Sequence, residues 1–194
     1  MKKDIILSGV GGQGILSIAT VIGRAALEEG LQIKQAEVHG MSQRGGDVQS
    51  NLRISSSRID SDLIARGGAD LIISLEPMEA LRYLPWLAAD GWVITNTTPF
   101  VNIPNYPDAE ALQRELASLP HVVALDVDSL AKAAASPRSA NMVLLGAAAP
   151  FLGLEAGKFE QGIRAIFARK GDAVVGMNLA AFRAGYEQAK KQIR

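Results

Sequence analysis

The sequence contains no cysteine, and this absence excludes several kinds of chemistry. The chain can form no disulfide bond, can use no cysteine nucleophile, and can offer no thiolate to an iron–sulfur cluster or a zinc ion. Histidine is also scarce, because only His39 and His121 are present. A site made of several histidines is therefore not expected, and we predict that this chain holds no metal.

The chain also lacks an excess of charge of either sign. It contains 20 basic and 20 acidic residues, so its formal net charge is zero. Because nucleic acids and anionic membranes attract basic proteins, the composition predicts neither kind of partner. From Glu155 onward, eight basic residues stand against four acidic ones. This local excess suits an edge that docks another protein and is too weak for a nucleic-acid groove.

Long hydrophobic runs are absent as well. The longest apolar stretch, from Met142 to Leu154, contains Pro150 and is about 13 residues long, whereas a membrane span takes roughly 20 residues. The apolar run near the start of the sequence is broken by Asp4 and by glycines, which does not fit a signal peptide. We expect a cytoplasmic protein. A length of 194 residues with 48% hydrophobic content fits a single domain over residues 1–194.

Short apolar strands alternate with helices, which is the pattern of an α/β protein. A strand over 3–8, a helix from about residue 14 to Gly30 and a strand over 31–38 predict a βαβ unit with parallel strands. We therefore predict a doubly wound, mostly parallel sheet with flanking helices, Rossmann-like, and a helical C-terminal third. Further strands are expected over 48–54, 70–74, 91–95 and 121–126, and further helices over 76–87, 108–118, 136–148 and around 159–167 and 179–189.

A glycine-rich loop, SGVGGQG at residues 8–14, joins the first predicted strand to the first helix. It matches G-x-G-x-x-G, in which Gly9 makes the tight turn, Gly11 lets the backbone approach a pyrophosphate, and Gly14 packs the helix on the strand. Glu37 stands where an acid would hold a ribose. The motif alone is a weak signal, because glycines can also serve only to make a strand-to-helix turn.

A second loop, HGMSQRGG at residues 39–46, follows the second predicted strand. Loops at the carboxyl ends of parallel strands form one crevice, so Arg44 and Gln13, whose amide indicates a specific contact, are expected to face it together. Arg44 with loop amides suits a carboxylate or a phosphate. A structural clamp or a salt bridge to a partner subunit fits Arg44 equally well. His39 is interpreted as a loop histidine with satisfied hydrogen bonds rather than as a base.

The two loops together resemble a known family. SGVGGQGI followed by EVHGMSQRGGDVQSNLRIS is similar to the gamma-type domain of the 2-oxoacid:ferredoxin oxidoreductases, and most of all to the small subunits of the indolepyruvate type. Two later stretches, NMVLLGA at 141–147 and NLAAFRAGY at 178–186, extend the resemblance nearly from end to end. The pair of loops is far more specific than either loop alone.

The resemblance implies a role inside a larger enzyme. Such complexes oxidatively decarboxylate a 2-oxoacid, here an arylpyruvate, to an acyl-coenzyme A and reduce ferredoxin, with thiamine diphosphate and [4Fe-4S] clusters as cofactors. These cofactors are implied to lie on a large partner subunit or at its boundary, because this chain has no cysteine and no convincing thiamine motif. The chain is then a non-redox subunit that completes the active site, with no catalytic residue of its own.

The resemblance also implies where the partner meets this chain. The glycine loops would form the face against the catalytic subunit, and Arg44 would touch a phosphate of coenzyme A or thiamine diphosphate. The residues assigned in this way to cofactor binding are Gly11, Gly12, Gln13, Gly14, Ser42, Gln43, Arg44 and Gly45.

Two alternatives stay open. The chain could be the equivalent subunit of a pyruvate or 2-oxoglutarate oxidoreductase, or it could be a free-standing dinucleotide-binding reductase.

Phe100 and Tyr106, in the proline-rich stretch 96–107, are predicted to lie at an interface, whereas Trp92 is predicted to pack in the core. An isolated chain could form a homodimer through such a surface.

Overall fold

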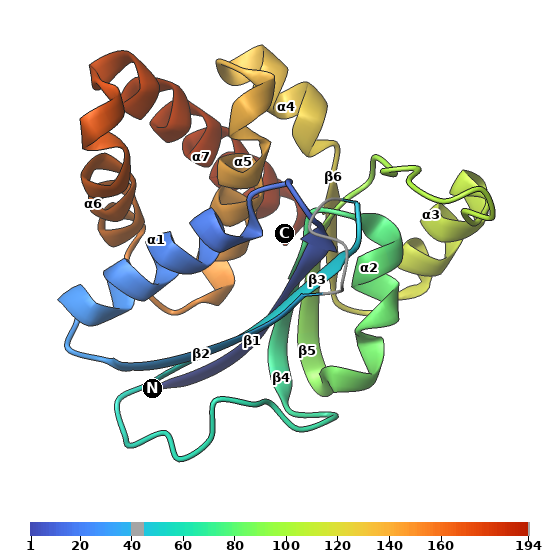
Figure 1. The fold of residues 1–194 in the computed structure, drawn as a ribbon, viewed down its shortest axis with the longest axis horizontal. Helices are drawn as coiled ribbons and strands as arrows, with labels where there is room; N and C mark the ends of the chain where they lie inside the picture. The colour runs from blue at the N-terminus through green and yellow to red at the C-terminus, as the bar shows by residue number, and fades with distance from the viewer. Residues whose placement is uncertain (40–44, 194) are drawn as a thin grey trace.

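The computed structural model describes residues 1–39 and 45–193, and its centre is one six-stranded sheet (Figure 1). The strand order is β2-β3-β1-β4-β5-β6. Each strand predicted from the sequence is present, and β5 begins earlier than predicted. The strands are β1 (Lys2–Val10), β2 (Gln32–His39), β3 (Asp47–Ser55), β4 (Ala69–Ser74), β5 (Leu87–Asn96) and β6 (Val122–Leu125).

The sheet is mostly parallel, as predicted, but one strand runs the other way. β1 pairs in parallel with β4, β4 with β5, and β5 with β6. β3 is antiparallel to both β1 and β2, so it separates the two strands of the predicted βαβ unit. The prediction that β1 and β2 run in the same direction is correct, but the prediction that they are neighbours in the sheet is wrong. The short connection from β2 to β3 explains the insertion, because an antiparallel return needs only a hairpin, whereas a parallel neighbour needs a crossover.

Helices cover both faces of the sheet, which makes it doubly wound (Figure 1). Ile5 and Leu7 of β1 point into one core with α1, α5, α6 and α7, whereas Ile6 points into a second core with α2 and α3. Successive strand residues face opposite sides, and the apolar run of β1 therefore supplies both cores. The helices are α1 (Ile15–Glu28), α2 (Pro77–Arg82), α3 (Ala109–Ser118), α4 (Val127–Ala134), α5 (Ala140–Ala148), α6 (Ala156–Phe167) and α7 (Asp172–Gln192).

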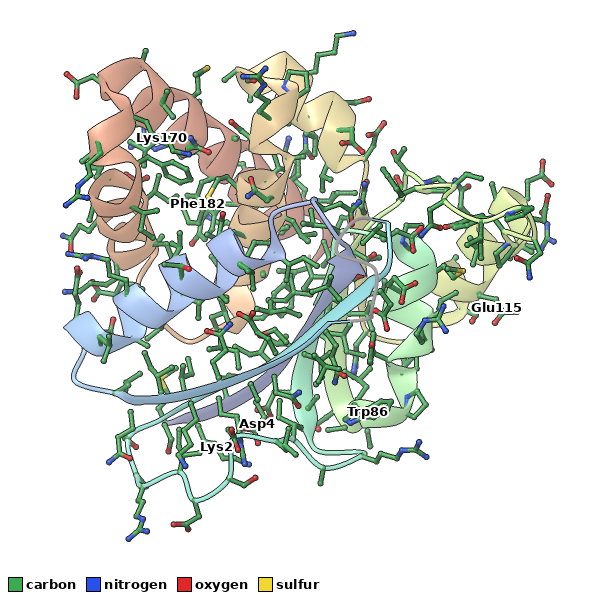
Figure 2. The ribbon with its side chains drawn as sticks, viewed as in Figure 1. Lys2, Asp4, Trp86, Glu115, Lys170 and Phe182 are labelled. Carbon is green, nitrogen blue, oxygen red and sulfur yellow. The ribbon has the colours of Figure 1, made fainter. Side chains whose placement is uncertain are left out.

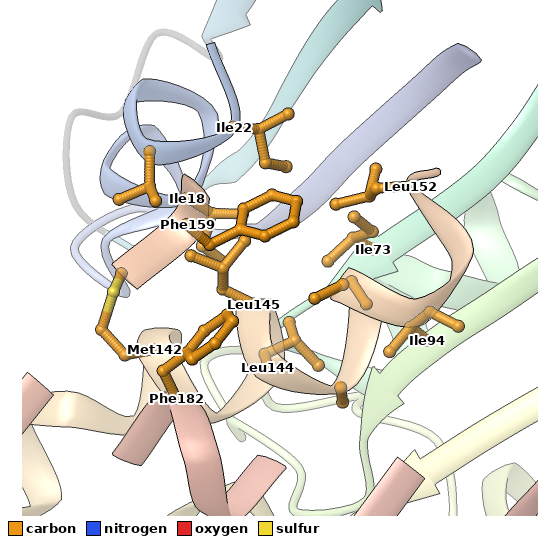
Figure 3. Close-up of a cluster of buried hydrophobic side chains, with 14 of the residues drawn as sticks. Ile18, Ile22, Ile73, Ile94, Met142, Leu144, Leu145, Leu152, Phe159 and Phe182 are labelled. Atoms are coloured by element: carbon orange, nitrogen blue, oxygen red, sulfur yellow. The ribbon is translucent and has the colours of Figure 1, made fainter. Parts of the chain in front are cut away.

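The helical C-terminal third is built around α5, which is buried from Met142 to Ala148 (Figure 3). Glycines allow α5 and α7 to cross at short range. A Cβ on Gly146 would lie 1.9 Å from the Phe182 carbonyl oxygen, and a Cβ on Gly185 would lie 1.9 Å from the Val143 carbonyl oxygen. The two late stretches that resemble the oxidoreductase family are therefore the two sides of one helix crossing.

Two helices differ from their predicted bounds. The helix predicted over 76–87 is only α2, followed by the 3-10 turn η1 (Leu84–Trp86) and then by β5. Pro85 lacks an N–H group and disfavours a helical conformation at Leu84, so the α-helix ends before it. The helix predicted from Ser136 begins as the 3-10 turn η2 (Pro137–Ser139), which Ser136 caps, and α5 follows. In the part of the chain that the structure describes, no helix is long and apolar enough to cross a membrane.

Candidate functional site

The first glycine loop connects β1 to α1 at the carboxyl edge of the parallel strands, where ligands of open α/β sheets bind (Figure 1). Gly14 precedes α1 in the left-handed conformation, with φ at 86°, which favours glycine. A Cβ on Gly14 would lie 2.7 Å from Nδ2 of Asn141. The same Nδ2 donates a hydrogen bond to the Gly14 carbonyl at 3.2 Å. Gly14 thus joins the loop to the start of α5.

Gln13 uses its amide inside the chain. Its Oε1 accepts a hydrogen bond from the Val10 N–H at 2.8 Å, and its Nε2 donates to the Leu75 carbonyl at 3.3 Å. The amide therefore ties the β1–α1 loop to the end of β4. The specific contact expected from the sequence exists, and its partners are backbone groups of this chain. Cofactor binding by Gln13 stays a prediction.

The two glycine loops meet, as the position of their strands predicts. The Gly11 N–H donates to the Gly46 carbonyl at 2.9 Å, and the Gly45 N–H donates to the Gly11 carbonyl at 3.5 Å. These bonds extend the β1–β3 ladder past its last residue pair. Ser42, Gln43, Arg44 and the side chain of His39 lie outside the described residues, so their assigned roles stay predictions.

The surface beside the first loop is a small, mostly apolar hollow. Its volume is about 280 Å³, and the side chains of Ile15, Leu16 and Val48 line it together with the backbone of Gly11, Gly12 and Gly14. Among the described residues that line it, none is cationic. This part of the loop therefore offers no charged partner to a pyrophosphate, whether of a dinucleotide or of coenzyme A.

The position of Glu37 also argues against a dinucleotide site. In a dinucleotide-binding fold, the acid that holds the ribose follows the strand next to the glycine-loop strand. Here β3 lies between β1 and β2, and Glu37 is exposed on β2 at the outer edge of the sheet. Its Oε1 accepts a hydrogen bond from Gln35 Nε2 at 2.8 Å. The alternative of a free-standing dinucleotide-binding reductase loses its geometric basis.

A third segment, residues 97–107 between β5 and α3, lies against the second glycine loop. Asn102 Nδ2 donates to the Gly45 carbonyl at 2.5 Å. Glu76, a fully buried carboxylate that caps α2, anchors the segment by accepting from the Phe100 N–H at 3.3 Å and from the Tyr106 hydroxyl. Burial and the Glu76 carboxylate raise the pKa of Tyr106. Glu76 was missed at the level of sequence because a glutamate at the start of a helix is usually exposed.

The anchored segment exposes apolar side chains. Phe100 is 46% exposed, Val101 71% and Ile103 37%. We call these three residues the apolar edge. The exposure of Phe100 agrees with its predicted place at an interface, whereas Tyr106 serves as the anchor. Trp92 packs as predicted, with its ring 5.0 Å from His121 and 4.6 Å from Phe151 between centroids.

Two carboxylates lie close together behind the loops. Glu79 is 2% exposed, and Arg82 Nε donates to it at 2.7 Å. Tyr83, which follows the last residue of α2, donates its hydroxyl to Asp47 Oδ2 at 2.6 Å, which places Asp47 near Glu79. Burial and the charge of Asp47 raise the pKa of Glu79 to about 7, against the opposing effect of Arg82. This cluster can therefore hold a proton near neutral pH.

We call the edge of the sheet that carries the two glycine loops and residues 97–107 the glycine-loop edge. Its described side chains hold the loops in place rather than form a reactive group. Amides of Gln13, Asn102 and Asn141 bond to backbone carbonyls of neighbouring loops. Within residues 1–39 and 45–193, no group of three or more histidine, aspartate or glutamate side chains is placed to hold a metal ion. A pre-organised surface with exposed apolar side chains suits the docking of another protein better than bond making.

The sequence matches the family model of pyruvate ferredoxin/flavodoxin oxidoreductase over residues 4–188. The chain belongs to this oxidoreductase family. One curated relative is subunit IorB of indolepyruvate oxidoreductase from Archaeoglobus fulgidus, which is 37% identical over 97% of this chain and 96% of its own length. The IorB subunit from Pyrococcus horikoshii is 36% identical over 100% of this chain and 99% of its own length.

One solved structure has a fold similar to that of this chain. It is the 2-oxoglutarate:ferredoxin oxidoreductase from Magnetococcus marinus, solved with 2-oxoglutarate, coenzyme A and succinyl-CoA bound. The TM-score is 0.77 at 22% sequence identity. The match covers 98% of this chain and 31% of the other chain. The likeness confirms the predicted α/β fold and shows that such a unit also occurs within a longer chain.

Proposed function

We propose that this chain is the non-redox small subunit of a 2-oxoacid:ferredoxin oxidoreductase of the indolepyruvate type, with residues 1–194 forming one gamma-type domain. The main support is the identity of 36–37% to IorB subunits over nearly the full length of each protein. The complex converts an arylpyruvate to an arylacetyl-coenzyme A and passes the electrons to ferredoxin, a reaction of the EC 1.2.7 type.

The cofactors of this reaction are assigned to the large subunit. The chain has no cysteine to ligate a [4Fe-4S] cluster. Thiamine diphosphate, when bound, supplies the carbanion chemistry, and the hollow beside the first glycine loop does not fit a diphosphate, because no cation lines it among the described residues. The contribution of this chain is therefore to dock, to complete the enclosure of the active site and to exclude water from it.

The docking surface in this proposal is the glycine-loop edge. The apolar edge of Phe100, Val101 and Ile103 is exposed there, beside loops that backbone hydrogen bonds already hold in place. A pre-ordered surface loses little conformational entropy when it binds a partner. In the Magnetococcus marinus enzyme, the matching unit makes up 31% of a longer chain, which supports association of this unit with other parts of an enzyme.

The eight residues assigned to cofactor binding from the sequence, which include Gln13 and Arg44, are proposed to lie at this docking surface. Arg44 is the residue proposed to touch a phosphate of coenzyme A or thiamine diphosphate at the boundary with the partner. The described contacts of Gln13 give it a positioning role, since it fixes the loop rather than facing a ligand.

The proposal is tested by co-expression of the chain with a large subunit of the indolepyruvate type. We expect indolepyruvate-dependent reduction of a viologen dye, in the presence of coenzyme A, only when both chains are present. A large subunit that is equally active alone would contradict the proposal. Faster turnover with pyruvate or 2-oxoglutarate would instead assign the chain to the equivalent subunit of those enzymes. Arg44→Ala is expected to lower activity, and unchanged assembly and kinetics would remove the proposed role of Arg44.

A further inference from the structure

A cavity of about 440 Å³ lies on the helical side of the sheet, away from the apolar edge. The start of α1, the 3-10 turn η2 and the corner between α6 and α7 enclose it. Lys170, labelled in Figure 2, stands at that corner. We call it the α5–α7 cavity. None of its lining residues is among those assigned to the docking surface, so the inference does not rest on the proposed function.

The charged side chains that line this cavity are both cationic. Arg138 comes from η2, and Lys170 comes from the 3-10 turn η4 (Ala168–Lys170) that precedes α7. No carboxylate lines the cavity among the residues that the structure describes. Asp172 is the acid that follows Lys170 most closely along the chain, and it does not line the cavity. The cavity therefore attracts an anion.

One buried polar atom in the wall lacks a partner. It is Oδ1 of Asn141, which lines the cavity and has no hydrogen bond among the described residues. Because buried polar groups are normally hydrogen-bonded, this atom indicates a molecule that occupies the cavity. Two further polar side chains line the wall. The Ser139 hydroxyl makes no capping bond to α5, and Asn178 donates from Nδ2 to the Val174 carbonyl at 2.8 Å.

A larger hollow near the first residue, of about 580 Å³, provides a contrast. Its polar groups already pair with one another. Arg53 donates to the two carboxylate oxygens of Asp4 at 2.7 and 3.0 Å, and the Met1 amino group donates to Ser56 Oγ at 2.8 Å. The cations of the α5–α7 cavity thus have no carboxylate among its described lining residues, unlike Arg53 in the larger hollow, and Lys170 Nζ lies 5.5 Å from the centre of the Phe167 ring.

We propose that the cavity lined by Arg138 and Lys170 binds a small organic phosphate. The two cations contact the phosphoryl oxygens, and the hydroxyls of Ser139 and Ser17 donate hydrogen bonds to them. α5 begins at the cavity without a side-chain cap, and the positive end of its dipole adds to the attraction. Phe167, Val174 and Met177 form the apolar part of the wall, which suits a carbon group attached to the phosphate and leaves free phosphate with fewer contacts.

The test is a titration of the full chain with phenyl phosphate and with inorganic phosphate at fixed ionic strength. Binding is measured by isothermal titration calorimetry and by changes in amide chemical shifts. We expect phenyl phosphate to bind several-fold more tightly than inorganic phosphate. The largest shifts are expected at Ser139 and Lys170. Absence of binding at millimolar concentration, or equal affinity for the two probes, would contradict an organic phosphate as the occupant.

Variants separate a built site from attraction to positive charge in general. Arg138→Gln with Lys170→Gln is expected to raise the dissociation constant of phenyl phosphate at least tenfold. Arg169→Gln is the matched control, because Arg169 precedes Lys170 in the same turn and does not line the cavity. Equal weakening by the control, or an unchanged dissociation constant in the double variant, would overturn the proposal. Both variants change exposed side chains and are expected to fold.

Discussion

The glycine-loop edge and the α5–α7 cavity differ in what their polar groups do. At the edge, the amides of Gln13 and Asn102 bond to backbone carbonyls of the same chain, and the exposed side chains are apolar. In the cavity, the buried Oδ1 of Asn141 lacks a partner among the described residues, and the charged side chains that line the wall are the cations Arg138 and Lys170. This difference underlies the two proposals, in which the region with the nucleotide-binding motif docks a protein and the region without a motif binds an anion.

One residue connects the two regions. Asn141 lines the cavity, and its Nδ2 donates to the Gly14 carbonyl of the first glycine loop. The Oδ1 of Asn141 is buried and has no partner among the described residues. A molecule in the cavity thus lies next to the amide that holds the glycine loop.

The largest effect is expected at the glycine crossing between α5 and α7. Gly185→Ala would place a Cβ against the Val143 carbonyl of α5. Because helix backbones cannot move apart locally without loss of packing, we expect the free energy of unfolding to fall by about 3 kcal/mol. Chemical denaturation measures this change.

The control for Gly185 is Gly176, which lies in the same helix with open space where its Cβ would be. Gly176→Ala is expected to leave the free energy of unfolding unchanged or to raise it by up to about 1 kcal/mol. Equal destabilisation by the two alanine variants would show that the close crossing of α5 and α7 is not present in solution.

The second effect is a pH dependence that comes from the carboxylates behind the glycine loops. The pKa of Glu79 is about 7 in the folded chain and has an ordinary value of 4.5. The folded state therefore binds the Glu79 proton more tightly than the unfolded state does. The resulting contribution to the free energy of unfolding is complete below about pH 4.5 and is lost as the pH rises through 7. We expect the free energy of unfolding to fall by about 2 kcal/mol between pH 5 and 8.

Glu79→Gln removes the titrating group and keeps an oxygen that can accept from Arg82. Its free energy of unfolding is expected to change much less over the same pH range. Denaturation curves at several pH values compare the two proteins. A wild-type chain that becomes more stable from pH 5 to 8 would contradict the raised pKa.

The third effect separates a bracing amide from a ligand-binding amide. Gln13→Ala removes hydrogen bonds to Val10 and Leu75, and we expect the free energy of unfolding to fall by about 1–2 kcal/mol in the absence of any ligand. Gln113→Ala, on the exposed surface of α3, is the control, with an expected change within about 0.5 kcal/mol. If both variants were equally stable, Gln13 would be free for a ligand and the contrast between the two regions would fail.

Local signals predicted the elements that depend on neighbouring residues. The apolar run of β1, the glycine loop before α1 and the start of a helix near residue 108 are properties of a few consecutive residues. The insertion of β3 between β1 and β2 was not predicted, because strand order depends on contacts between residues far apart in the sequence.

The same reason limits what the sequence could predict about the site. The meeting of Gly11 with Gly45 followed from the position of the two loops at one sheet edge. The burial of Glu76, the bond from Asn141 to Gly14 and the cavity between α1 and α7 join parts of the chain that no motif relates. The roles assigned to Ser42, Gln43 and Arg44 stay predictions.

The most direct test of the central claim is the affinity of this chain for the large subunit after substitution in the apolar edge. Val101→Ser is expected to leave the free energy of unfolding within about 0.5 kcal/mol of the wild type, because the side chain is exposed. Leu27→Ser, on an exposed side chain of α1 that is 64% accessible, is the control. The account predicts that Val101→Ser weakens binding to the large subunit at least tenfold while Leu27→Ser does not, and equal affinity of the two variants for the large subunit would contradict it.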